Sequence, residues 1–254
     1  MDNRQQTFTI PVIRELLRNS VKQRKKLEEA YTLLPSTQCE RKTQCCSLLP
    51  DMTLLEALTA IQQLARMPSV MRKKLTKKMI SYFILNPVEI MSCPFLNYRD
   101  CLIYQNRFFG CRAYGLWSHG YYEKIASNNR EVKKQFQMQW QKLGVSLPQS
   151  VIDFQVPYCT CVKVGGETVI NDEMLLHTVN TITALSEQFL EWHQLFGQWY
   201  FSDLSFLLTS LVFGVKDAVK MKFSIVREVV VTGNKSRLET VLEQLPDICT
   251  EFTP

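Results

Sequence analysis

The sequence predicts a mainly α-helical protein with a small β-hairpin element, of the α+β class, in which a loop-rich cysteine cluster packs among helices. Three observations predict this class. Apolar residues recur at helical spacing over most of the chain, Val, Thr and Tyr gather around Gly165–Gly166, and six of the nine cysteines lie at 39–111. With 46% hydrophobic residues among 254, the chain can bury a full core without disulfides. We expect two domains, a metal-binding domain at 1–150 and a hairpin followed by helices at 151–254.

Three helices are expected in the first 85 residues. Apolar spacings of three, four or six predict a helix from Ile10 to Leu34, with Pro11 in its first turn and Pro35 after its end. Residues 36–47 have no such period and are expected to form a loop. Thr53 and Glu56 form a capping-box pattern that predicts a helix to Met67, and a third helix follows at 70–85.

The middle of the chain is less regular. Residues 93–117 mix aromatic, turn and polar residues, so we expect short strands and loops around a site. A polar helix is expected after Tyr121, ending at Gly144. Residues 154–171 predict a β-hairpin with its turn at Gly165–Gly166.

The last third is expected to be helical, from Asp172 to a short amphipathic helix at 236–245. Its longest apolar run, Leu204–Val215, is well short of the roughly twenty residues that span a bilayer. We therefore expect no membrane span. The start of the sequence has no apolar secretory segment, so we expect a cytoplasmic protein with reduced thiols.

The net charge of +6 is concentrated on two expected helices, at 18–26 and 72–78. A solvated helix face is the usual meaning of such runs, and no aromatic residues for base stacking are interleaved with them. The sequence therefore argues against nucleic-acid binding. A protein partner or substrate is expected, of unknown identity.

The grouped cysteines are the main chemical signal. Grouped thiolates are typical of a soft metal ion or an iron-sulfur cluster, whereas buried structural thiols need no grouping. Unligated buried thiols and disulfides remain as alternatives, although disulfides need an oxidising compartment. The candidate metal ligands are Cys39, Cys45, Cys46, Cys93, Cys101 and Cys111.

The arrangement of these cysteines resembles the YkgJ-type cysteine-cluster family, described as a zinc- or iron-chelating domain. The resemblance covers about residues 37–117 and rests on the CC pair at 45–46, CPFL at 93–96, CLIY at 101–104 and Cys111-Arg112. Lys42 stands where the family pattern has its second cysteine. Phe108 stands where the pattern usually has a proline. The resemblance implies metal or cluster binding.

Four of the six cysteines are expected to bind the cofactor: Cys45, Cys93, Cys101 and Cys111. Adjacent residues rarely both reach one ion, so Cys46 could be a packed neighbour, and Cys39 is the least certain ligand. Zinc sites usually contain paired C-x2-4-C knuckles, which these six lack. Widely spaced ligands favour an iron-sulfur cluster, most simply [4Fe–4S], with zinc as the alternative.

The expected function is a metal-binding protein with an iron-sulfur cluster and a redox or protein-modifying role. The alternative is a zinc-stabilised interaction protein without catalysis, and the sequence does not decide whether the protein is an enzyme. Arg107 and Arg112 could offset thiolate charge, bind an anionic substrate or form surface salt bridges. His119 could be a further ligand or a proton donor. Cys159 and Cys161 could join a metal site or be buried in a sheet.

Overall fold

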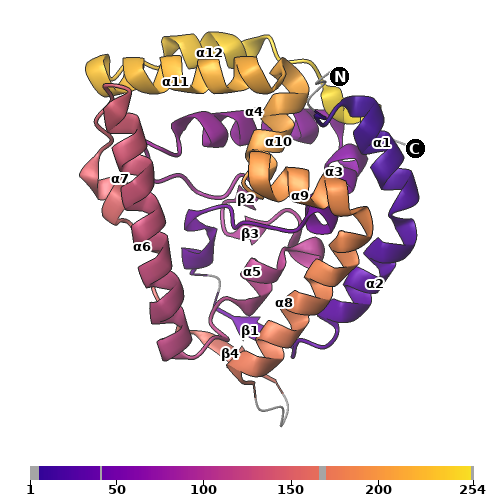
Figure 1. Cartoon of the computed structure of the whole chain (residues 1–254). Coiled ribbons are helices and arrows are strands. Elements are labelled where there is room, and N and C mark those ends of the chain that lie inside the picture. Colours follow the sequence, from indigo (N-terminus) through magenta and orange to yellow (C-terminus); the bar gives the residue numbers. More distant parts are fainter. Residues whose placement is uncertain (1–5, 41, 166–169, 253–254) are drawn as a thin grey trace.

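The computed structural model describes residues 6–40, 42–165 and 170–252. It is mainly helical with two small antiparallel sheets, as the sequence predicts. Figure 1 shows α6 (His119–Lys142) along one side and α11 (Val215–Thr232) with α12 (Ser236–Glu243) across one end. In the described part of the chain, no helix is both long enough and apolar enough to cross a membrane.

The first helix differs from the prediction because it is divided at Ser20. The helices α1 (Ile10–Asn19) and α2 (Val21–Tyr31) meet there. The Arg24 guanidinium donates to Ser20 Oγ at 3.1 Å and to the Leu17 carbonyl at 2.7 Å. A carbonyl engaged by a side chain is drawn away from its helical partner, which explains the interruption.

The next two helices follow the prediction. Helix α3 (Leu54–Arg66) begins with a complete capping box between Thr53 and Glu56. Helix α4 (Ser69–Leu85) follows after Pro68. Both are buried along much of their length, so they form the centre of the molecule.

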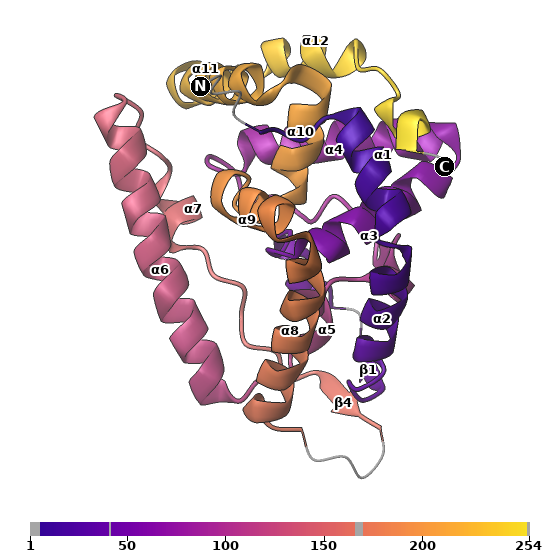
Figure 2. The same ribbon diagram turned by 45° about the vertical axis from the view of Figure 1, so that its right-hand side comes forward.

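The later helices pack around these two. Figures 1 and 2 show α8 beside α2 and α10 beside α4, and both pairs are in contact. The bounds of the remaining later helices are α7 Gln149–Asp153, α8 Asp172–Ser186, α9 Leu190–Trp199 and α10 Leu204–Phe213. The main core therefore combines residues from both halves of the chain, and the expected division at residue 150 stays a prediction.

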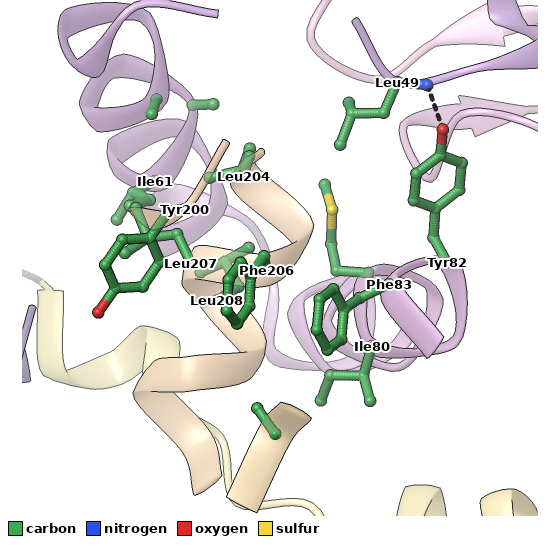
Figure 3. Packing of buried hydrophobic residues seen from close by; sticks show 14 of the residues in the cluster. Leu49, Ile61, Ile80, Tyr82, Phe83, Tyr200, Leu204, Phe206, Leu207 and Leu208 are labelled. Atoms are coloured by element: carbon green, nitrogen blue, oxygen red, sulfur yellow. Dashed lines mark hydrogen bonds between the residues drawn. The ribbon is translucent and has the colours of Figure 1, made fainter. Parts of the chain in front are cut away.

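The core between α4 and α10 is shown in Figure 3. The rings of Phe83 and Phe206 stack with centroids 4.7 Å apart, and Leu207 beside them is fully buried. On the other side of α4, the Leu49 N–H donates to Tyr82 Oη at 2.8 Å. This bond fixes the segment that follows the Cys45–Cys46 pair onto the core.

The predicted hairpin at 154–171 lies partly outside the described residues, and its described strand pairs with a distant segment. Strand β4 (Val162–Val164) pairs with β1 (Thr37–Cys39), with Cys39 opposite Val162. Gly165 also donates to the Ser36 carbonyl at 3.0 Å, while Gly166 lies outside the described residues. The local hairpin lies instead at β2 (Leu96–Asn97) and β3 (Asp100–Cys101). A strand that pairs with a distant segment leaves no local signal, so its composition alone suggested a hairpin.

Candidate metal centre

Cys45 and Cys46 lie in a short 3₁₀ turn at Gln44–Ser47. Thr43, which precedes it, has a left-handed backbone with φ of 57° and accepts a hydrogen bond from the Cys46 N–H at 2.8 Å. The Cys46 carbonyl then accepts the N–H of Cys93 at 2.7 Å. This bond joins the first cysteine segment directly to the second.

Cys93 and Cys101 flank the β2–β3 hairpin. Leu96 pairs with Cys101 in the ladder, and the Leu96 N–H donates to the Cys93 carbonyl at 2.9 Å. The Leu102 N–H donates to the Phe95 carbonyl at 3.0 Å, while Phe95 is fully buried. The hairpin therefore brings these two thiols to the same side as the 45–46 turn.

Cys111 lies on the short helix α5 (Phe109–Ala113), which Glu56 of α3 anchors. The Glu56 carboxylate accepts the Phe109 N–H at 2.6 Å and the Tyr31 hydroxyl at 2.5 Å. Glu56 is only 4% exposed, so these contacts replace water. The capping-box residue predicted from sequence thus also positions the helix that carries Cys111, a role that local spacing could not reveal.

All six predicted cysteines line one cavity of about 80 Å³. Its lining includes the apolar residues Leu48, Phe95 and Phe108 and the charged residues Arg99, Asp100 and Arg107. One water needs roughly 10–15 Å³ of such space. The cavity is therefore several times larger than the minimum that one water needs.

The thiols are close enough to influence each other's ionisation. Electrostatic interaction joins every pair among four of them: Cys45, Cys93, Cys101 and Cys111. Cys46 also lies within hydrogen-bonding reach of Cys45, with the two sulfurs 3.8 Å apart. The four thiols predicted as cofactor ligands therefore form a mutually interacting set.

Burial dominates the ionisation of most of these thiols. It raises the pKa of Cys93 to about 12, with neighbouring thiols adding to the increase, and it raises the pKa of Cys101 and Cys111 as well. A hydrogen bond from Cys46 lowers the pKa of Cys45 to about 7. Metal binding at these thiols would have to release protons.

Among the described residues, no group of three or more His, Cys, Asp or Glu side chains is arranged to hold a metal ion. The six thiols surround the cavity, but coordination requires some of them to turn toward a common centre. The donor chemistry and the cavity fit a thiolate-bound group, whereas the side-chain directions in the structure are not yet those of a coordinated site.

The two arginines beside Cys111 have different environments. Arg112 donates from Nε to the Arg107 carbonyl at 2.9 Å, and its guanidinium stacks over the Tyr31 ring at 4.2 Å. Arg112 therefore interacts with other residues of the protein. Arg107 lies over Tyr104 at 4.2 Å, but its Nε is buried and has no hydrogen-bond partner. Its charge acts on Cys45, Cys101 and Cys111.

Three further cysteines lie outside the set of six. Cys159 is buried near Cys39 and Cys45, while Cys161 accepts a hydrogen bond from Lys42 Nζ at 3.1 Å. Neither residue lines the cavity. Cys249 is fully buried against Thr76, with Sγ and Oγ1 3.7 Å apart.

His119, a possible further ligand or proton donor, is not among the residues that line the cavity. Ser118 caps α6 by accepting the Tyr121 N–H, so the helix begins earlier than predicted and takes His119 onto its exposed first turn. There His119 packs edge-on against Tyr158 and lies 3.8 Å from the Glu123 carboxylate. The sequence did not single out Arg99 or Asp100, whose only signal was their place before Cys101.

In comparisons with known proteins, no family model matches the chain, and no curated protein or solved structure shows significant similarity. The resemblance to YkgJ-type proteins therefore stays a prediction carried by the cysteine motifs.

Proposed function

We propose that this protein holds an iron-sulfur cluster, most simply [4Fe–4S], in the cysteine-lined cavity. The proposed ligands are Cys45, Cys93, Cys101 and Cys111. The observation that carries the proposal is that these four thiols, from three separate segments, interact with one another around a single cavity. When bound, such a cluster takes up and releases single electrons.

The buried Nε of Arg107 gives separate support. An unpartnered buried donor costs about 1–3 kcal/mol, and more when the group is charged. Arg107 lines the cavity and acts electrostatically on three of the proposed ligands. A cluster would supply sulfur acceptors for this N–H group and a negative charge for its guanidinium.

The ligand set makes the cluster preferable to a single zinc ion. Its thiols come from a 3₁₀ turn, a hairpin and a short helix, with no tight knuckle that supplies two ligands. Cys46 and Cys39 remain as alternative ligands. We further propose an electron-transfer role, with modification of a protein substrate as the alternative use of the same centre.

Anaerobic reconstitution with iron and sulfide tests the proposal. We expect a brown protein with about four irons and four acid-labile sulfides per chain, and an absorbance that dithionite bleaches. Cys93→Ser and Cys101→Ser should each lose most of this iron. Cys249→Ser is the control, because Cys249 is a buried thiol that does not line the cavity.

Two results would contradict the proposal. One is a colourless protein with one tightly bound zinc and no sulfide, which would support the structural zinc alternative. The other is full iron and sulfide content in both cavity variants, since the ligands would then lie elsewhere. Circular dichroism of each variant, measured before loading, separates loss of ligands from loss of fold.

A further inference from the structure

A basic and aromatic rim surrounds the mouth of the cysteine cavity. Arg99 and Tyr104 are exposed residues of the cavity lining, and Arg107 lies between Tyr104 and the thiols. Asp100 is the one acidic side chain among the described lining residues. The positive charges of the rim therefore outnumber its negative charge.

Helix α4 extends this charge beyond the hairpin. Lys78 Nζ donates to the Leu96 carbonyl at 2.7 Å, which fixes α4 against the strand that precedes the hairpin turn. Lys74 lies one turn earlier on α4 and is exposed. Burial, followed by the nearby charge of Lys74, lowers the pKa of Lys78. The two lysines beside the hairpin and Arg99 in its turn are therefore all positively charged.

Tyr98 projects from the tip of the same hairpin. Its backbone is left-handed, with φ of 55°, and its side chain is 92% exposed. A bulky non-glycine residue rarely takes this conformation, which here places the ring at the tip of the turn. Tyrosine and arginine are also the residues that most often contribute binding energy at protein interfaces.

We propose that the rim residues Arg99 and Tyr104, together with Lys74, Lys78 and Tyr98 on and beside the hairpin, form the docking surface for an acidic electron-transfer protein. This inference rests on the proposed cluster and adds the class of the partner and the surface through which the electron would pass. Arg99, Asp100 and Cys101 line the same cavity, so a cluster bound there would lie close to this surface. One electron would pass between the two centres, oxidising one and reducing the other.

The charges favour an acidic partner over a neutral one. Opposite charges steer encounter and raise association rates by roughly 10–10³-fold, and salt screens this effect over about 10 Å at 0.1 M. Small, weak interfaces are typical of electron-transfer complexes.

The test measures oxidation of the dithionite-reduced, cluster-loaded protein by stopped-flow absorbance. The probes are plastocyanin, an acidic acceptor, and cytochrome c, a basic one. We expect plastocyanin to react faster at low salt, with its rate falling about tenfold or more between about 10 mM and 0.5 M salt. The rate with cytochrome c should stay level or rise with salt.

Two double variants locate the effect. Lys74→Glu with Arg99→Glu should slow the plastocyanin reaction about tenfold at low salt, within the range expected for lost steering. Lys25→Glu with Lys26→Glu on α2 makes the same change in net charge and should slow it less than about twofold. Tyr98→Ala should slow the plastocyanin reaction at all salt concentrations, because this substitution removes a contact without changing the charge.

Equal slowing by both double variants, or faster reaction with cytochrome c, would overturn the docking surface while leaving the cluster in place. Absence of a bleachable absorbance before mixing would overturn the cluster itself and the docking inference with it. The absorbance of each variant, recorded first, keeps the two failures distinct.

Discussion

Glu56→Gln should destabilise the fold because one buried carboxylate joins three elements. Its oxygens accept hydrogen bonds from the Thr53 N–H at 2.8 Å, the Thr53 hydroxyl at 2.9 Å, the Phe109 N–H at 2.6 Å and the Tyr31 hydroxyl at 2.5 Å. The glutamine amide keeps one acceptor oxygen and turns a donor group toward the remaining donors. Two of the four bonds to the carboxylate are therefore lost: the backbone N–H on that side has no acceptor, and the hydroxyl beside it must turn to accept from the amide.

The size of the effect follows from these bonds. A hydrogen bond to a charged group contributes about 1.5–3 kcal/mol, so two of them give roughly 3–6 kcal/mol before relaxation. Burying a neutral amide costs less than burying a carboxylate, which offsets part of the loss. We expect the free energy of unfolding to fall by about 2–4 kcal/mol.

Urea denaturation followed by tryptophan fluorescence measures this change, since the chain has four tryptophans. Tyr31→Phe removes a single donor and should cost about 1 kcal/mol. Glu28→Gln is the matched control on the exposed face of α2 and should change the free energy by less than about 0.5 kcal/mol. A loss below about 0.5 kcal/mol for Glu56→Gln would refute the network as a source of stability.

The other predictions concern separate parts of the structure. Thr53→Ala removes the cap of α3 and should cost about 1 kcal/mol in the same urea assay. Leu207→Ala, at a fully buried position, should cost about 2–5 kcal/mol. Burial lowers the pKa of Lys222 to about 8 from the ordinary lysine value of 10.5. Between these two pH values the unfolded chain binds more protons than the folded protein, so stability rises with pH there. Lys222→Met, compared by thermal melts, should remove about 1–2 kcal/mol of that rise, because the side chain is only half-buried. His119→Ala should leave iron content after reconstitution unchanged, and iron loss would return His119 to the ligand set.

Local sequence patterns predicted the helices whose start and apolar face are set by residues within the helix itself. The capping box at Thr53 and the apolar spacing of α3 and α4 are properties of short segments, so sequence alone revealed them. The break at Ser20 depends on where the Arg24 side chain folds back, and helical spacing on both sides concealed it. The β4 strand pairs with β1, more than one hundred residues away, and local composition could not reveal that pairing.

The candidate site likewise combines features that the sequence predicted with features that only the tertiary structure decides. Sequence determined which residues could bind a soft metal, because thiol chemistry and grouping are visible in the chain itself. It did not determine that Glu56 anchors the helix carrying Cys111, that Arg107 faces the thiols, or that His119 points elsewhere. Those facts depend on how distant segments pack, since burial and electrostatic contact are properties of neighbours in space and not of neighbours in sequence.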